Sequence, residues 1–202
     1  MKVGIVDYGV GNIFSLQNAL VHVGVDAVVS KDGKVLDNCS GIILPGVGAF
    51  NDAAANIFEE GLDQAIKAQA EKGKLILGIC LGMQLLFDYS TEGRATRGLG
   101  LINGWVDRIP GNVKVPHMGW NTLHGKNECK ALEGIRDGAY VYFVHSYYAR
   151  AENSKDICAV SSYGASIAAV VERDNVLGMQ FHPEKSGETG LKILNNIKEM
   201  LI

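Results

Sequence analysis

Short apolar runs alternate with helical patterns through the first 80 residues of the chain. Uninterrupted apolar runs predict buried strands at residues 3–6, 25–29, 41–44 and 74–77. Apolar residues at helical spacing predict a helix over residues 13–21, after a turn at residues 9–12, and one long helix over residues 54–66 that ends near Gly73. Because strands that alternate with helices need crossovers, we expect a mostly parallel sheet covered on both faces.

After about Gly98 the predicted elements become shorter and richer in β-branched residues. This pattern of short β-branched segments predicts meander strands at residues 106–109, 113–115, 139–144, 157–161 and 167–172. Residues 176–181 form a further apolar run, and residues 193–201 place their apolar side chains on one helical face. We therefore predict a three-layer α/β fold in a single domain, residues 1–202, with a central mostly parallel sheet, helices on both faces and a smaller antiparallel region.

Charge and hydrophobicity narrow the class of protein. The 202 residues include 22 acidic and 19 basic side chains, a net charge of −3, and 47% are hydrophobic. An acidic balance argues against a nucleic-acid partner. The most apolar stretch, residues 75–87, is shorter than the ~20 residues of a membrane span, and the N-terminus lacks a secretory apolar segment. We expect a cytoplasmic protein with no membrane partner.

The cysteine spacing disfavours a metal site. The four cysteines lie at least 29 positions apart and form no pair or cysteine–histidine cluster at metal-ligand spacing: Cys39, Cys80, Cys129 and Cys158. We expect no metal and no cofactor, and packing roles for all of these cysteines except Cys80.

Cys80 stands where the strand at residues 74–77 passes into a helical pattern. The frame Gly78-Ile79-Cys80-Leu81-Gly82 has the spacing of a nucleophile elbow, in which small neighbours let the chain turn sharply. A cysteine at a helix start faces backbone N–H groups that favour the thiolate and can stabilise an oxyanion. The alternative interpretation of this short pattern is a buried packing cysteine.

A base for that thiol is available in the segment Gln180-Phe181-His182-Pro183-Glu184. His182 and Glu184 follow an apolar strand, and residues two apart in extended chain point to the same side. The alternative is an exposed histidine beside a solvated glutamate. Together with the elbow upstream, however, the pair predicts a triad of Cys80, His182 and Glu184.

The segment Pro45-Gly46-Val47-Gly48 also follows a strand. Its glycines let backbone N–H groups approach an anion, so we predict that Gly46, Val47 and Gly48 form an oxyanion loop together with the N–H of Leu81. An ordinary tight turn is the alternative. His117 and His145 are interpreted as packing or loop histidines, although the aromatic residues around His145 also suit a partner surface.

In this order, the loop, the elbow and the His-Pro-Glu segment resemble the class I glutamine amidotransferases over the whole chain. Further segments resemble the glutaminase subunits of imidazole glycerol phosphate synthases within that family: PGVGAF at 45–50, STEG at 90–93, PHMGWN at 116–121, HSYY at 145–148 and PEKS at 183–186. The resemblance implies that Cys80 attacks the glutamine amide, and that His182, oriented by Glu184, transfers the protons. It also implies that glutamine binds to Gln84, Glu92, Ser146 and Tyr147.

The resemblance further implies a heterodimer with the cyclase subunit of that synthase, which consumes the ammonia in histidine biosynthesis. The residues expected at the interface are Asn12, Met118, Trp120, Tyr142 and Lys185. We also expect the loop at Val47 to rest in an incompetent orientation until the cyclase binds its substrate.

Three alternatives share some of these features. A glutaminase subunit of another synthase, such as anthranilate synthase, would keep the triad and differ only in the segments that face the partner. A stand-alone cysteine hydrolase or peptidase is a second alternative, and Gln84 with Glu92, which suit a small polar substrate, argue against it. The third, a non-catalytic binding module, would not need all three triad residues.

Overall fold

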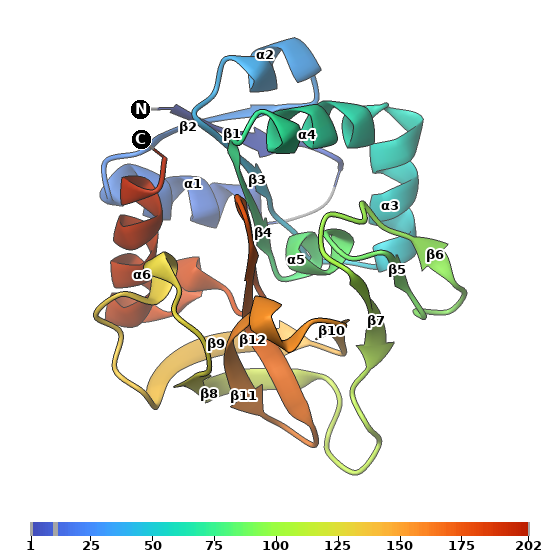
Figure 1. The fold of residues 1–202 in the computed structure, drawn as a ribbon, viewed down its shortest axis with the longest axis vertical. Coiled ribbons are helices and arrows are strands. Elements are labelled where there is room, and N and C mark those ends of the chain that lie inside the picture. Colours follow the sequence, from blue (N-terminus) through green and yellow to red (C-terminus); the bar gives the residue numbers. More distant parts are fainter. Residues whose placement is uncertain (1, 10–11, 202) are drawn as a thin grey trace.

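The computed structural model describes residues 2–9 and 12–201, and a nine-stranded sheet runs through its centre (Figure 1). The strands lie in the order β2 (Asp26–Ser30), β1 (Lys2–Val6), β3 (Gly41–Leu44), β4 (Leu75–Ile79), β13 (Val176–Met179), β12 (Ser166–Arg173), β11 (Ile157–Ser162), β8 (His117–Gly125) and β9 (Ala139–His145). The strands from β2 to β13 are mutually parallel. From β13 to β9 every pairing is antiparallel, so much of the predicted antiparallel region continues the same sheet.

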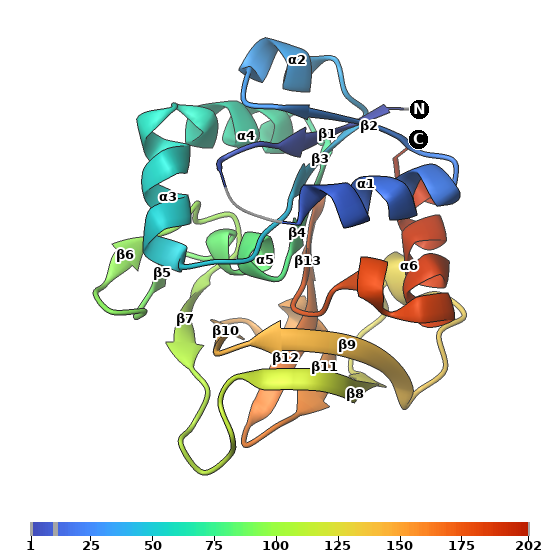
Figure 2. The same cartoon turned by 180° about the vertical axis from the view of Figure 1, so that it is seen from behind.

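Helices cover both faces of the parallel part, as predicted (Figures 1 and 2). One face carries α1 (Ile13–His22) and α6 (Gly187–Glu199), and the other carries α2 (Gly33–Asp37), α3 (Phe50–Glu59), α4 (Leu62–Glu71) and α5 (Leu81–Leu85). Neighbouring residues of a strand point to opposite faces. In β3, accordingly, Ile43 packs into the core under α1 and α6, whereas Ile42 and Leu44 pack into the core under the other helices.

A second sheet of four short strands lies beside α5. Its order is β10 (Tyr147–Ala151), β7 (Gly104–Arg108), β5 (Tyr89–Ser90) and β6 (Thr96–Arg97). Three 3₁₀ turns complete the described elements: η1 (Lys130–Leu132), η2 (Ser154–Asp156) and η3 (Pro183–Lys185). Because β10 directly follows β9, the second sheet brings Tyr147 from the end of the central sheet to α5, where its carbonyl accepts a hydrogen bond from Gln84 Nε2 at 2.8 Å.

Two sequence predictions about these elements were wrong. The long helix predicted to end near Gly73 is two helices, α3 and α4, because Gly61 between them has φ +67°, a left-handed conformation that ends a helix. Residues 113–115 form no strand. Val113 and Val115 instead pack beside Ile109, Tyr148 and Ile167, so their apolar pattern reflects local packing rather than pairing.

In the predicted turn at residues 9–12, Val10 and Gly11 lie outside the described residues. Among the described residues, no helix has both the length and the apolar character needed to cross a membrane.

Candidate active site

Cys80 lies at the junction of β4 and α5 in a strained backbone conformation. Its φ of 53° and ψ of −107° are unusual for a residue with a side chain. The flanking glycines make this turn possible. A Cβ on Gly78 would lie 2.5 Å from the carbonyl oxygen of Gly82, and a Cβ on Gly82 would lie 1.8 Å from the carbonyl oxygen of Leu44. The elbow geometry predicted from the glycine spacing is therefore present in the structure.

His182 reaches the same place because β13 lies next to β4. The two strands run parallel, with Met179 opposite Ile79, so the residues that follow them emerge at one edge of the sheet. The backbone N–H of Cys80 donates to the carbonyl of Met179 at 2.7 Å. Residues about 100 positions apart in the sequence are thus neighbours at the strand ends.

The His182 ring is oriented by Glu184. His182 Nδ1 lies 2.8 Å from Glu184 Oε1, and both side chains are only 3% exposed. An acceptor-only carboxylate at Nδ1 requires the proton on that nitrogen. The other nitrogen, Nε2, is buried and makes no hydrogen bond within the described part of the chain. Nε2 is therefore free to exchange a proton with a reacting group.

The charge state of His182 follows from its neighbours. Burial lowers the pKa of His182, but the Cys80 sulfur and the Glu184 carboxylate raise it by more, so the pKa lies at about 9 instead of 6.5. At neutral pH the ring is therefore protonated. A cationic imidazole beside a sulfur stabilises the thiolate, which is the state in which cysteine acts as a nucleophile.

The predicted oxyanion loop contacts the elbow through a carbonyl group. The N–H of Leu81 donates to the carbonyl of Gly46 at 3.4 Å, so this donor is occupied within the protein. The hydroxyl of Tyr8 donates to the carbonyl of Pro45, and a Cβ on Gly46 would lie 2.9 Å from both Tyr8 Oη and Leu81 Cβ. The structure thus places Gly46 against Leu81, with an acceptor where oxyanion stabilisation needs a donor.

All four residues predicted to bind glutamine line one cavity of ≈ 280 Å³ beside Cys80: Gln84, Glu92, Ser146 and Tyr147. Gln84 Nε2 donates to the Tyr147 carbonyl at 2.8 Å and to Gln180 Oε1 at 3.1 Å, so its carbonyl oxygen remains available as an acceptor. Glu92 Oε2 accepts the N–H of Phe50 at 2.8 Å. This hydrogen bond ties Glu92 to the start of α3.

Sequence reasoning missed two buried residues at the site, Tyr8 and Gln180. Gln180 Nε2 lies 3.7 Å from the Cys80 sulfur while its oxygen accepts from Gln84. Its place between an apolar strand and His182 was the available signal. Tyr8 gave none, because its contact with Pro45 joins segments that are 37 positions apart.

His117 and His145 form a buried polar chain behind the cavity. His145 Nδ1 lies 2.8 Å from the Tyr147 carbonyl, which can only accept, so the proton sits on Nδ1. His145 Nε2 then accepts from His117 Nδ1 at 3.0 Å, and His117 Nε2 accepts from Asn121 Nδ2 at 3.3 Å. His117 also stacks on Phe143, with 4.7 Å between ring centroids. The predicted packing role describes His117, whereas His145 also lines the cavity.

The three histidines predict a maximum of stability near neutral pH. Burial lowers the pKa of His117 and of His145 to about 4, so the stability that these neutral rings contribute is present above about pH 6.5 and is lost toward pH 4. The raised pKa of His182 acts in the opposite sense. Its contribution is complete below about pH 6.5 and is lost as the pH rises toward 9. The free energy of unfolding, measured with urea between pH 4 and pH 9, tests the loss of stability in both directions.

Glu184→Gln tests the loss of stability at alkaline pH. Replacing the carboxylate by an amide removes a cause of the raised His182 pKa. The fall in unfolding free energy between pH 6.5 and 9 should therefore become shallower, while the fall toward pH 4 should not change. Equal alkaline slopes in both proteins would contradict this assignment.

The residues predicted for the interface lie at the start of α1 and on β8, β9 and η3. Figure 2 shows α1, β8 and β9 on one face of the molecule, and η3 contacts both α1 and β9. Met118 is 63% and Trp120 55% exposed, and Trp120 makes an edge contact with Tyr142 at 5.9 Å between centroids. Asn12 caps α1 by accepting the N–H of Ser15 at 3.5 Å, and Lys185 is exposed. Phe14 of α1, which was not among the predicted residues, is also 73% exposed.

Comparison with known proteins shows the family of the chain. The family model of class-I glutamine amidotransferases matches residues 4–200. The imidazole glycerol phosphate synthase subunit HisH of Caldanaerobacter subterraneus subsp. tengcongensis is 53% identical over 200 residues, covering 98% of each chain. The HisH subunit of Aquifex aeolicus is 47% identical over 199 residues, covering 98% of this chain and 96% of the relative.

Solved structures resemble the fold over nearly the whole chain. PurLQS from Thermotoga maritima superposes with a TM-score of 0.80 at 23% identity, covering 100% of this chain and 99% of that one. The glutaminase domain of Trypanosoma brucei CTPS has a TM-score of 0.69 at 16% identity, covering 98% and 94%. These structures share the fold, and the family model together with the sequence relatives shows the family: the chain belongs to the class-I glutamine amidotransferases.

Proposed function

We propose that this chain hydrolyses glutamine to glutamate and ammonia with Cys80, His182 and Glu184, and delivers the ammonia to the cyclase subunit of imidazole glycerol phosphate synthase. The observation that carries the chemistry is the buried His182–Glu184 pair, which leaves His182 Nε2 free and sets the ring against Cys80 of the strained elbow. The family and its HisH relatives support the pathway.

The reaction begins with attack of the Cys80 thiolate on the amide carbon of glutamine. His182, protonated at neutral pH, gives the Nε2 proton to the departing nitrogen, and ammonia leaves with formation of a glutamyl thioester. The neutral ring then takes a proton from water, which attacks the thioester and releases glutamate. Glu184 holds the proton on Nδ1 and stabilises the cationic ring at both steps.

The cavity beside Cys80 supports a small polar substrate. Its volume of ≈ 280 Å³ suits an amino acid. The carboxylate of Glu92 and the free oxygen of Gln84 are acceptors for the ammonium group of glutamine, and this is the role that we assign to them.

We further propose that the loop at residues 46–48 switches between two orientations. In the structure the Gly46 carbonyl occupies the Leu81 N–H, so a developing oxyanion would meet an acceptor. Gly48 has φ +133° and Val47 is 39% exposed, and a peptide flip at these positions would turn an N–H toward the oxyanion. The flip would be favoured when the cyclase holds its own substrate, which couples the two sites.

The exposed apolar residues around Trp120 support the docking of a partner. Phe14, Met118 and Trp120 are more than half exposed, and aromatic residues and methionine are enriched in protein interfaces. Ammonia that escapes into water becomes ammonium, which is a poor nucleophile, so a docked cyclase would also protect the product. We place the reaction in the cytoplasm because all four cysteines are free thiols, which are typical of a reducing compartment.

Glutamate release tests the proposal. We expect a low rate with this chain alone, little change with the cyclase subunit, and a large rise when the cyclase also holds a substrate or product analogue. Glutaminase activity that rises with a different synthase instead would show that the protein serves another pathway. A full rate in the isolated chain would contradict the coupling.

An interface variant sharpens this experiment. Trp120→Ala removes an exposed aromatic anchor and should raise the dissociation constant of the cyclase by about 30-fold or more, which corresponds to the cost of about 2 kcal/mol expected at an interface hot spot. Tyr89→Ala is the matched control, because Tyr89 is 42% exposed on β5 of the second sheet. Equal affinities of the two variants would place the interface elsewhere.

A further inference from the structure

Away from the active site, Cys129, Cys158 and Glu172 bring two thiols and a carboxylate together. Their ligand atoms all lie within 4.8 Å of one another, and Cys158 Sγ donates to Glu172 Oε2 at 3.8 Å. No step of the proposed glutamine hydrolysis uses these groups. We propose that they bind a thiophilic divalent cation of the zinc class.

The donor set matches that class of ion. Zinc binds thiolates at about 2.3 Å and carboxylate oxygens at about 2.0–2.2 Å in a tetrahedral arrangement, and ligands at these distances lie roughly 3.5–3.8 Å apart. The spacing in the structure is close to this, so small side-chain rotations would complete three corners of a tetrahedron. Water would occupy the fourth corner. Two sulfur ligands select against magnesium and calcium, which prefer oxygen.

Cys158 is aimed at the cluster by a β-bulge. Ile157 pairs with Val171 of β12 and Ala159 pairs with Val170, so Cys158 is the extra residue between two successive pairs. A bulge interrupts the alternation of a strand and redirects one side chain. The irregularity in β11 thereby gives the buried thiol its position beside Glu172 of the neighbouring strand.

Cys129 is held over this bulge by hydrogen bonds from the preceding residues. The N–H groups of Lys126 and Asn127 donate to the Cys158 carbonyl at 2.8 and 3.3 Å. The Asn127 side chain also donates to the Ile157 carbonyl at 2.8 Å. These bonds fix the segment before Cys129 to the strand that carries Cys158, so the two thiols meet in a positioned arrangement rather than by chance contact of flexible ends.

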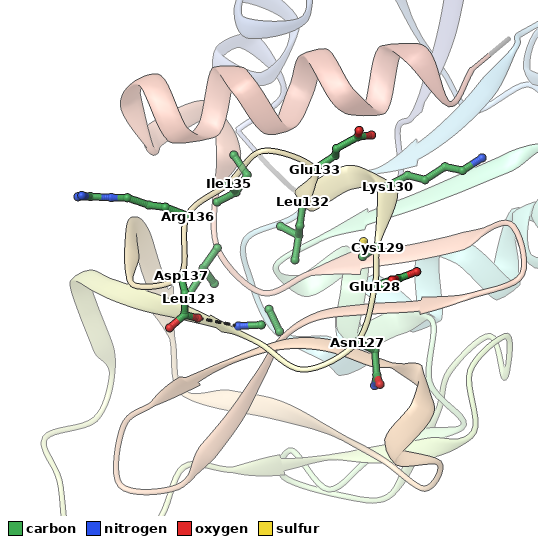
Figure 3. Close-up of a pocket in the computed structure, with 12 residues that line it drawn as sticks. Leu123, Asn127, Glu128, Cys129, Lys130, Leu132, Glu133, Ile135, Arg136 and Asp137 are labelled. Carbon is green, nitrogen blue, oxygen red and sulfur yellow. Dashed lines mark hydrogen bonds between the residues drawn. The ribbon is translucent and has the colours of Figure 1, made fainter.

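The segment between β8 and β9, which carries Cys129, is also held by α6. Asn196 Nδ2 donates to the carbonyls of Ala131 and Glu133 at 3.1 and 2.8 Å. Figure 3 shows the segment arching below this helix, with Lys130 and Arg136 extending outward and away from the arc. These two basic side chains therefore do not point toward the sulfur of Cys129.

An acidic cavity of ≈ 670 Å³ leads to the cluster. The side chains that line it include one lysine, Lys130, and five carboxylates: Glu128, Glu133, Glu172, Asp174 and Glu199. Carboxylates gathered on the walls of an opening raise the local concentration of cations. The cavity thus offers both the attraction and the path that a metal ion needs to reach the thiols.

Binding exchanges protons for the metal. The ion forms two metal–sulfur bonds and one metal–oxygen bond, and the two thiol protons go to solvent, so each bound ion releases up to two protons. The bonds would join the segment between β8 and β9 to β11 and β12. The expected consequence is greater stability of this region, with the rate of glutamine hydrolysis unchanged.

Cobalt(II) titration tests the site, because thiolate ligation gives an intense charge-transfer absorption that carboxylate or histidine ligation does not. The full chain is used in a Cys80→Ala background, so that the active-site thiol contributes nothing, and it is reduced and freed of reductant beforehand to prevent a Cys129–Cys158 disulfide. We expect one cobalt ion per chain with this absorption, displacement by zinc, and proton release on zinc binding.

Single variants assign the ligands. Cys129→Ser and Cys158→Ser each remove one of the two thiolates, so each should lower the charge-transfer absorption per bound cobalt ion and weaken zinc binding by more than about 100-fold, since loss of an outer-shell partner alone costs about 10–100-fold. Glu172→Gln should weaken binding while keeping the band. Cys39→Ser is the matched control, because Cys39 is a buried thiol outside the cluster.

Zinc should raise the thermal midpoint of the Cys80→Ala protein and of the Cys39→Ser control, but not of Cys129→Ser. Circular dichroism without metal verifies that each variant folds. The absence of the absorption in folded protein, or an unchanged band in folded Cys129→Ser, would overturn the proposal. Neither result would affect the proposed hydrolysis of glutamine, which depends on Cys80.

Discussion

Cys80→Ala is expected to lower glutamate release by on the order of 10⁴- to 10⁶-fold, the loss seen when a triad nucleophile is removed. The sulfur is the atom that forms the thioester, and among the described residues no other cysteine lines the cavity beside Gln84. Because alanine removes only the sulfur from a site that is 5% exposed, the fold should persist. Glutamate release under saturating glutamine, with the cyclase and its ligand present, measures the effect.

Two controls separate lost chemistry from lost structure in this experiment. Cys39→Ser changes another buried thiol, whose contact with the Val35 carbonyl at 3.4 Å a hydroxyl can keep, and it should retain activity. Ammonium salts supplied to the complex should restore the cyclase reaction of Cys80→Ala, because they replace only the missing ammonia. Substantial glutamine hydrolysis by Cys80→Ala would refute the assigned nucleophile.

Gly82→Ala is expected to cause the largest loss of stability among single methyl additions near the site. The new Cβ would lie 1.8 Å from the Leu44 carbonyl oxygen and 2.6 Å from the Leu44 carbonyl carbon. These are backbone atoms of β3, so the clash cannot be relieved by rotating a side chain. We expect a loss of about 3 kcal/mol or more and a fall in melting temperature of roughly 6–12 °C for a chain of this size.

Activity should fall in Gly82→Ala as well, because α5 carries the Leu81 N–H and Gln84 next to Cys80. Gly111→Ala is the matched control. A Cβ there meets no atom of the described residues within 4 Å, so its effect on the unfolding free energy should stay within about 0.5 kcal/mol. Thermal and urea unfolding of both variants measure the difference, and similar stabilities would show that the elbow can move away from β3.

The sequence already contained the chemistry of the elbow. Gly78 and Gly82 around Cys80 specify a sharp strand-to-helix turn because the chain must pass close to its own backbone there. His182 and Glu184 could be paired from sequence for a similar reason, since the proline between them restricts a two-residue step. These relationships are local, and local sterics can be inferred from a single sequence.

The pattern of buried strands likewise determined the fold class. Apolar runs separated by helical spacing require a covered parallel sheet, and the strands from β2 to β13 have that form. The break between α3 and α4 was missed because an apolar stripe continues on both sides of Gly61, and only its left-handed backbone separates the two helices.

Hydrophobic periodicity did not determine which distant groups meet, and the tertiary structure did. The adjacency of β4 and β13 brings His182 to Cys80, and this adjacency depends on the order of strands in the sheet, which hydrophobic periodicity does not encode. The Gly46 carbonyl points toward Leu81 because of the orientation of one peptide plane. The glycine spacing in the sequence is compatible with either orientation of that plane. Cysteine spacing argued against a metal site, yet a bulge in β11 and the hydrogen bonds of Asn127 bring Cys129 and Cys158 together. Sequence therefore determined the reactive groups and their local geometry, whereas long-range strand pairing, which depends on the packing of the whole chain, decided which of those groups share a site.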